Sequence, residues 1–212
     1  MNTKIEILEA GINDLEIARE AARCIRDGGV ILYPTDTIYG IGCDASNEKA
    51  VEKIFEIKKR SASNPVLMLA SSVPMVESLV EEISPQAFRL MNKFWPGPLT
   101  LLFKPKKKMP KLLIPENNKI GIRIPANQFC LYMIEQCNTP VVSTSANLSG
   151  IQTSGKISEL KKIFFGKVDL IIDRGDLENI TPSTIVDVTS ESVIVVREGV
   201  ITREEVGSII NL

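Results

Sequence analysis

Three short segments of this sequence concentrate polar side chains that could bind an anion or a polar ligand. Residues 34–40 carry two threonines and an aspartate after an apolar run, residues 58–64 include Lys58, Arg60 and Asn64, and residues 143–150 are rich in hydroxyls. Lysine, arginine and amide groups on a short loop suit a triphosphate. Hydroxyls can hydrogen-bond a polar ligand without carrying charge. The pattern predicts a site for a phosphorylated, polar substrate.

The first two segments also have purely structural explanations. Residues 34–40 suit a capped turn, and cations at 58–60 are favoured at the C-terminus of a helix. Lys58 and Arg60 converge on one anion only if the helix ends between them, because residues two apart do not share a helix face. Pro65 makes such an end expected, since a proline pushes the preceding residue out of the helical region.

The composition excludes whole classes of catalyst. The 212 residues include 25 Lys plus Arg, 26 Asp plus Glu and no histidine. Ser-His-Asp and Cys-His nucleophiles and imidazole-bound zinc are therefore excluded. The chemistry must depend on charge and positioning, or on Asp, Glu, Lys or a tuned Cys. A net charge of −1 provides no global field for nucleic acid.

The cysteines and the hydropathy indicate a cytoplasmic protein with no membrane contact. Cys24, Cys43, Cys130 and Cys137 lack the C-x-x-C spacing of metal and redox motifs. We expect them to be buried, reduced thiols. The charged N-terminal segment does not suit a signal peptide, and no apolar run approaches the ~20 residues that span a bilayer.

Hydrophobic periodicity predicts how these segments are positioned. Helices are expected at 14–27, 47–58, 129–136 and 157–164, with two more within 73–94 and a last one after Thr202, which forms a capping box with Glu205. Strands are expected at 30–33, 66–69, 99–103, 120–124, 141–142, 168–172, 184–188 and 193–196. Helices and strands alternate early and strands cluster late, which favours an α/β fold with a mixed sheet. We expect one domain over residues 1–212.

Two nucleotide-binding signatures match only in part. Residues 150–156 fit the G-x-x-x-x-G-K skeleton of a P-loop, but Ile157 stands where a Ser or Thr would hold Mg²⁺. Residues 40–45 fit the dinucleotide fingerprint G-x-G-x-x-A, but no acidic residue follows ~20 positions on. Gly40 and Gly42 better suit a tight turn or a close backbone approach.

The most basic stretch, residues 104–111, has two interpretations. A solvated hairpin loop is favoured. An RNA footprint is the alternative, although no aromatic residues interleave for base stacking.

Seven motifs in order resemble the YrdC/Sua5 (TsaC) family of threonylcarbamoyl-AMP synthases, over residues 17–203. They are residues 33–45, Lys58-x-Arg60, and residues 94–100, 122–126, 145–150, 182–187 and 196–199. Each motif is weak alone, but their order is specific. Ser61 and Thr144 stand where the family usually has proline. The resemblance implies an α/β fold, a YrdC-like twisted mixed β-sheet with flanking helices around a positively lined groove, in the short single-domain form.

The resemblance also implies a reaction and its partners. L-threonine, bicarbonate or CO₂, and ATP would give threonylcarbamoyl-AMP and pyrophosphate, with Mg²⁺ carried by the ATP. A downstream threonylcarbamoyl transferase complex would then convert A37 of tRNA to t⁶A. Two alternatives stay open: an RNA-binding module with a tRNA or RNA contact, and a low-activity nucleotide-binding paralogue on the same fold.

The family's functional positions carry over to this sequence. The K-x-R…S-x-N signature implies that the catalytic residues are Lys58, Arg60, Ser145 and Asn147. The implied ATP-binding residues are Lys58, Arg60, Asn64, Ser145 and Arg197. The implied threonine-binding residues are Thr37, Arg123, Ser143 and Ser183, with Arg123 suited to the carboxylate. No protein ligand for the metal is expected, and Lys156 with residues 150–155 is the candidate for a loop that closes over the adenylate.

Overall fold

The computed structural model of the chain describes residues 6–9, 14–59, 66–106, 109–148, 150, 153–178 and 180–210. Their strands form one ten-stranded sheet in the order β1-β8-β2-β3-β7-β4-β6-β5-β9-β10. The strands are β1 (Glu6–Glu9), β2 (Ile31–Tyr33), β3 (Gly40–Asp44), β4 (Leu67–Leu69), β5 (Leu99–Phe103), β6 (Ile120–Arg123), β7 (Val141–Ser145), β8 (Leu170–Asp173), β9 (Thr184–Asp187) and β10 (Ile194–Arg197). Parallel and antiparallel neighbours both occur, so the predicted mixed α/β fold is confirmed.

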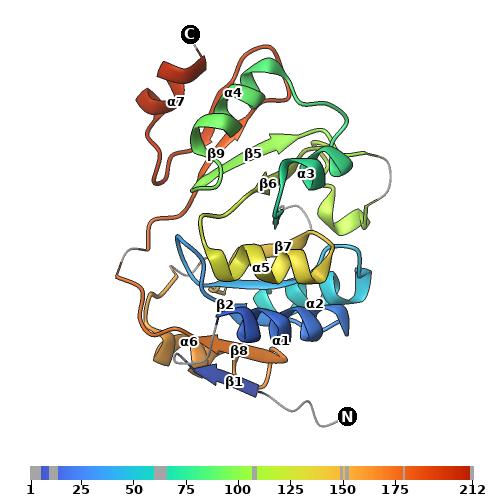
Figure 1. Cartoon of the computed structure of the whole chain (residues 1–212), viewed down its shortest axis with the longest axis vertical. Coiled ribbons are helices and arrows are strands. Elements are labelled where there is room, and N and C mark those ends of the chain that lie inside the picture. The colour runs from blue at the N-terminus through green and yellow to red at the C-terminus, as the bar shows by residue number, and fades with distance from the viewer. Residues whose placement is uncertain are drawn as a thin grey trace.

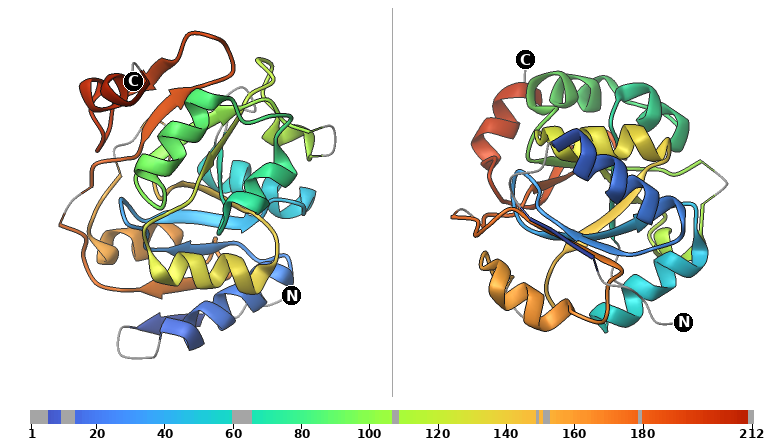
Figure 2. Two further views of the ribbon diagram at one scale, coloured as in Figure 1. Left: turned by 45° about the horizontal axis from the view of Figure 1, so that its top comes forward. Right: turned by 60° about the horizontal axis from the view of Figure 1, so that its bottom comes forward.

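Helices cover both faces of this sheet, as Figure 1 shows. They are α1 (Asp14–Arg26), α2 (Glu48–Lys58), α3 (Val73–Leu79), α4 (Pro85–Phe94), α5 (Gln128–Cys137), α6 (Ile157–Phe164) and α7 (Arg203–Ile210), with a 3₁₀ turn at Lys111–Leu113. The apolar faces of α1 and α5 pack on one side of the strands, and those of α2 and α6 pack on the other (Figure 2, right). The helices predicted at 14–27, 47–58, 129–136 and 157–164 are confirmed to within one residue at each end, and two helices lie within 73–94 as predicted.

The predicted caps are present at two helices. The Asn47 side chain accepts a hydrogen bond from Ala50 N at 3.2 Å and begins α2. Thr202 and Glu205 make the reciprocal bonds of a capping box before α7. The second helix ends at Lys58, because Lys59 adopts the left-handed conformation with φ 50°. The helix therefore ends before Arg60, as the sequence predicted.

Replacing Asn47 with alanine should lower the free energy of unfolding by about 1 kcal/mol, because an N–H at the start of α2 loses its acceptor. Urea unfolding followed by circular dichroism measures the change. Asn92→Ala is the matched control, since Asn92 lies exposed inside α4, where alanine is the better helix former. An unchanged unfolding midpoint in Asn47→Ala would contradict the capping role.

Three strands depart from the sequence prediction. Strands β1 and β3 were not predicted. The expected strand at 141–142 extends as β7 to Ser145, so Ser143 and Ser145 lie within a strand rather than in a loop after it. Polar residues continue this strand because β7 lies between β3 and β4, which bond to its backbone on both sides.

The four cysteines are free thiols. Cys43, Cys130 and Cys137 are buried and Cys24 is half-buried. Burial, aided by the nearby Asp169 carboxylate, raises the pKa of Cys24 to about 11, and burial raises the pKa of Cys137 to about 12. The predicted role as small hydrophobic residues is confirmed for three of them. No helix in the described part of the chain has the length and apolarity to cross a membrane.

Candidate functional site

A groove of about 490 Å³ opens over the middle strands of the sheet. Leu69 lines it and also belongs to the core beneath α1 and α5, so the groove lies on that face of the sheet, beyond the helices. Most of the predicted site residues line it, namely Thr37, Arg123, Ser143, Ser145, Asn147, Ser183 and Arg197. Segments far apart in the sequence therefore meet here, as the resemblance implied.

Arg123 is the most constrained charge in the groove, with 4% of its surface exposed. Its Nε donates to Gly97 O at 2.8 Å, and one terminal nitrogen donates to Thr37 Oγ1 at 2.9 Å. Asp36 pairs with the other terminal nitrogen and accepts from the backbone N–H of Ala126 at 3.1 Å. The guanidinium has five N–H groups, so the contacts with Gly97, Thr37 and Asp36 do not use all of them.

Residues 34–40 form a capped turn and several of them also line the groove, so both interpretations of the sequence apply to them. Thr35 Oγ1 accepts from Thr37 N at 3.1 Å and from Ile38 N at 3.2 Å, which makes a capped turn. The same turn aims Thr37 at the groove, where it meets Arg123. A structural and a functional role therefore coexist in these residues.

Ser183 and Arg197 also line the groove. Ser183 Oγ lies 2.9 Å from Thr100 Oγ1, and the Arg197 guanidinium donates to Ser183 O at 2.7 Å. Desolvation and the nearby Arg123 lower the pKa of Arg197, which indicates that two cations share one region. Among the described residues that line the groove, the charged ones are Arg123 and Arg197, and no carboxylate lines it. The groove is therefore positively lined, as predicted, and suits an anion.

Lys58 lies beneath the groove and only 1% of its surface is exposed. Its ammonium donates to the backbone oxygen of Ser145, to Asn147 O at 2.8 Å and to Asn147 Oδ1 at 3.2 Å. The Ser145 hydroxyl also donates to Asn147 Oδ1. Lys58 thus joins the end of α2 to the turn after β7 and fixes the shape of the S-x-N motif. The other two predicted residues, Arg60 and Asn64, lie outside the described residues.

Four residues that contact the site were not assigned a role from the sequence. Tyr33, Thr35, Asp36 and Thr100 hydrogen-bond or pair with the lining residues Ser143, Thr37, Arg123 and Ser183 respectively. All four stand inside the motifs at residues 33–45 and 94–100. The signal was present in the sequence, but only the fold shows which lining residue each one contacts.

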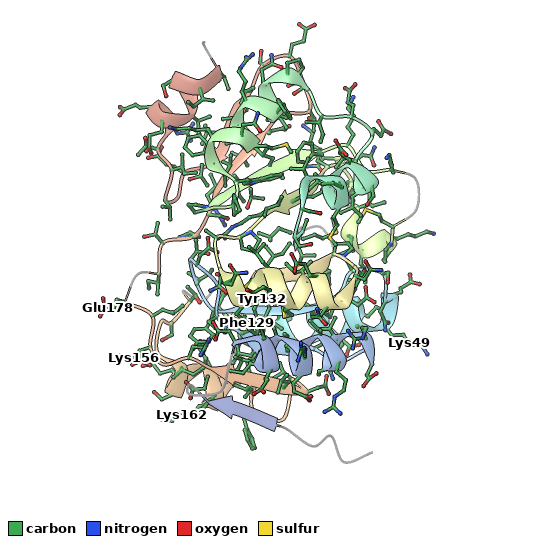
Figure 3. All side chains as sticks on the ribbon, in the orientation of Figure 1. Lys49, Phe129, Tyr132, Lys156, Lys162 and Glu178 are labelled. Atoms are coloured by element: carbon green, nitrogen blue, oxygen red, sulfur yellow. The ribbon has the colours of Figure 1, made fainter. Side chains whose placement is uncertain are left out.

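The segment around Lys156 is tied to a neighbouring loop. Leu177 N donates to Gly155 O at 2.9 Å, and a Cβ on Gly155 would lie 2.4 Å from Leu177 O. Lys156 itself is exposed at the outer edge of the molecule, near the segment that carries Glu178 (Figure 3). Thr153, just before it, lines the groove. Closure by this segment stays a prediction.

The basic stretch follows β5 and lies against α3. Lys106 Nζ donates to Glu77 O at 2.6 Å, and Lys106 N donates to Leu79 O at 2.9 Å. Glu81 N donates to Lys104 O at 2.9 Å. Acidic residues of α3 and the turn after it therefore lie beside these lysines. Residues 107 and 108 lie outside the described part of the chain. An RNA contact here stays a prediction.

The fold and the groove together define an α/β protein whose groove, lined by two arginines and a set of hydroxyls, suits a small ligand that carries negative charge. The family model for the Sua5/YciO/YrdC group, described as "Telomere recombination", matches residues 23–199. The chain belongs to this family.

One curated relative and two solved structures illustrate the similarity. The chain is 35% identical over 192 residues to the threonylcarbamoyl-AMP synthase of Pyrococcus abyssi, covering 91% of this chain and 56% of that protein. The crystal structure of P. abyssi Sua5 complexed with L-threonine matches with a TM-score of 0.90 at 34% identity, over 98% of this chain and 61% of that one. The crystal structure of E. coli YciO matches with a TM-score of 0.85 at 30% identity, over 96% and 98%.

Proposed function

We propose that the groove is the active site of a threonylcarbamoyl-AMP synthase, a nucleotidyltransferase that acts on L-threonine, bicarbonate or CO₂, and ATP. The observation that carries the proposal is the buried Arg123, which lines a groove together with Thr37, Ser143 and Ser183 and whose guanidinium is held by Gly97 O and Thr37 Oγ1. A guanidinium held in this way suits the carboxylate of a small amino acid, and the hydroxyls suit its other polar groups.

The reaction needs no protein nucleophile. The amine of threonine attacks the one-carbon substrate to form a carbamate, with loss of water from bicarbonate or of a proton with CO₂. A carbamate oxygen then bonds to the α-phosphorus of ATP as the bond to pyrophosphate breaks. Such transfers depend on positioning and charge neutralisation. The absence of histidine is therefore compatible with this chemistry.

The ATP site would lie along Ser145, Asn147 and Arg197, with Arg60 and Asn64 added from the family resemblance. Arg197 would face the phosphates, and Lys58 would shape the S-x-N turn from beneath. Mg²⁺ would enter with ATP as part of that substrate, as the family resemblance implies.

The similarity to the P. abyssi protein supports this proposal, but it covers only part of that protein. The P. abyssi relative is called a threonylcarbamoyl-AMP synthase, and its structure was solved with L-threonine. This chain spans 56% of that relative's length. We therefore also treat the downstream threonylcarbamoyl transferase complex, and t⁶A formation on tRNA, as parts of the proposal.

A second candidate is a nucleotide-binding paralogue with little or no turnover. The similarity to E. coli YciO keeps this candidate open, because that match covers 98% of the YciO chain and the name of the E. coli protein assigns it no activity. A nucleotide-binding paralogue would bind ATP in the same groove without forming pyrophosphate.

One assay separates the candidates: pyrophosphate release from MgATP, with threonine and bicarbonate each supplied or omitted, in buffer freed of dissolved CO₂. The synthase predicts release only when both are present, together with a product of the mass of threonylcarbamoyl-AMP. Release without threonine would indicate another substrate and contradict the proposal. ATP binding with no release under any condition would favour the paralogue, and salt-sensitive RNA binding with neither would favour the RNA module.

A further inference from the structure

Tyr33 lies directly beneath the groove and has no part in the reaction as proposed. Its side chain is fully buried, at 0% exposure. Its phenol hydroxyl donates to Ser143 Oγ at 2.7 Å, and Ser143 lines the groove. The hydroxyl of a fully buried tyrosine therefore contacts a residue that lines the groove.

The sheet is built so that this tyrosine can reach across a strand. Tyr33 is on β2 and Ser143 is on β7, with β3 between them. On β3, Gly40 is the partner of Tyr33 and Gly42 is the partner of Ser143. A Cβ on Gly42 would lie 2.8 Å from Tyr33 Cε1, and a Cβ on Gly40 would lie 3.1 Å from Ser143 Oγ. The absence of a Cβ at Gly42 leaves room for the tyrosine ring, and its absence at Gly40 leaves room for the Ser143 hydroxyl.

This explains the partial dinucleotide fingerprint at residues 40–45. The prediction that Gly40 and Gly42 permit a close approach is confirmed: the ring of Tyr33 approaches Gly42, and the hydroxyl of Ser143 approaches Gly40. Phe129 of α5, labelled in Figure 3, packs against the same ring, with centroids 6.4 Å apart. The ring is therefore held by an aromatic neighbour while its hydroxyl holds Ser143.

The hydrogen bond determines what Ser143 offers the ligand. Burial raises the pKa of Tyr33 above its ordinary value of 10.0, so the phenol stays protonated. The phenol hydroxyl donates its one hydrogen bond to Ser143 Oγ, and this bond uses one lone pair of the serine oxygen. The hydrogen of Ser143 itself has no protein acceptor in the described part of the chain, so it is free to point into the groove.

We propose that Tyr33 is a positioning residue that makes Ser143 a hydrogen-bond donor toward an acceptor oxygen of the amino-acid substrate. This inference rests on the proposed function. Without the phenol hydroxyl, the Ser143 hydroxyl would rotate freely and offer a donor or an acceptor with equal ease. The substrate oxygen would then lose an oriented partner while all charged contacts in the groove remain.

The test is Tyr33→Phe, which removes one oxygen and keeps the ring against Phe129. KM for threonine should rise about three- to tenfold, the usual worth of one neutral hydrogen bond. KM for ATP should stay within twofold, because the phosphate contacts are unchanged. Isothermal calorimetry with threonine and MgATP checks the binding directly.

Tyr39→Phe is the matched control. Tyr39 is equally buried, and its hydroxyl donates to Gly175 O at 2.8 Å and accepts from Arg174 N at 3.1 Å. Its side chain belongs to the core on the opposite face of the sheet. Both variants should lose stability, but only Tyr33→Phe should change KM for threonine. Equal values of KM in the two variants would overturn the role of Tyr33.

A double mutant shows whether Tyr33 acts through Ser143. In the Ser143→Ala background, Tyr33→Phe should cause no further change in threonine binding. Losses that simply add would mean that the two residues act separately, and would overturn the inference. A wild-type protein that binds no threonine would overturn the proposed function together with this role, whereas wild-type binding with an unaffected Tyr33→Phe variant would overturn this role alone.

Discussion

Arg123→Ala should lower kcat/KM for threonine at least ~10²-fold. A hydrogen bond to a charged group contributes roughly 1.5–3 kcal/mol, and the guanidinium lines the groove and keeps N–H groups that its bonds to Gly97 and Thr37 do not use. Water cannot readily replace the lost guanidinium, because only 4% of the surface of Arg123 is exposed to solvent. Threonine-dependent pyrophosphate release, measured over a range of threonine concentrations, gives the ratio.

Loss of Arg123 also removes the partner of Asp36, and breaking a buried pair costs ~3–5 kcal/mol. Circular dichroism must therefore confirm that the variant is folded at the assay temperature. Arg123→Lys keeps the charge but not the forked geometry, so we expect it to fold better and still bind threonine poorly. Arg23→Ala is the matched control, since Arg23 is exposed on α1 and pairs only with Glu20 in the described structure. Wild-type kinetics in both Arg123 variants would refute the threonine site.

Lys58→Ala should lower the rate of pyrophosphate release at least ~10²-fold, the scale of losing one well-placed charged donor. Arg60→Ala should have an effect of the same size, on the strength of the family signature. For Lys58 the reason lies in the turn after β7. Without the ammonium, Ser145 O and Asn147 O lose a buried donor, and each such loss costs ~1–3 kcal/mol. The S-x-N motif would then lose its shape.

The matched control for Lys58 is its neighbour Lys59→Ala. Lys59 is exposed in the left-handed position that ends α2, so the change removes a charge without affecting the groove. The kinetics distinguish two ways in which Lys58 could act. Distortion of the turn should raise KM for ATP and reduce kcat together, whereas loss of a contact made only in the transition state should reduce kcat alone. Pyrophosphate release near the wild-type rate from Lys58→Ala would refute both.

The elements of the fold could mostly be predicted from local sequence. Asn47 and Thr202 mark helix starts because a side-chain oxygen bonds N–H groups only two or three residues away. The apolar residues of α1 and α6 recur with a helical spacing that can be recognised within each segment alone. The strand β3 was missed because its glycines and its place after a capped turn indicate a loop, and only its pairing with β2 and β7 makes it a strand.

The site residues could be predicted as a set, but the contacts of each one could not. The roles of Lys58 in catalysis and ATP binding stay predictions, and only the fold shows that its ammonium donates to the backbone oxygens of Ser145 and Asn147. Thr37, Arg123 and Ser183, which the resemblance assigns to threonine, line one groove, and their binding of threonine stays a prediction. Asp36 and Thr100, which contact Arg123 and Ser183 respectively, stand inside the recognised motifs, but the sequence does not show these contacts.

The sequence by itself determined which kinds of group could act. It excluded imidazole chemistry, supplied cations and hydroxyls in an ordered set of motifs, and placed each motif near the end of a helix or strand. Only the tertiary structure decided which groups meet. Arg123 contacts Thr37 and Tyr33 contacts Ser143 across 86 and 110 residues of chain. The physical reason is that helix periods and caps are set by neighbours in sequence, whereas hydrogen-bond direction in a site is set by strand order, register and the space that glycines leave.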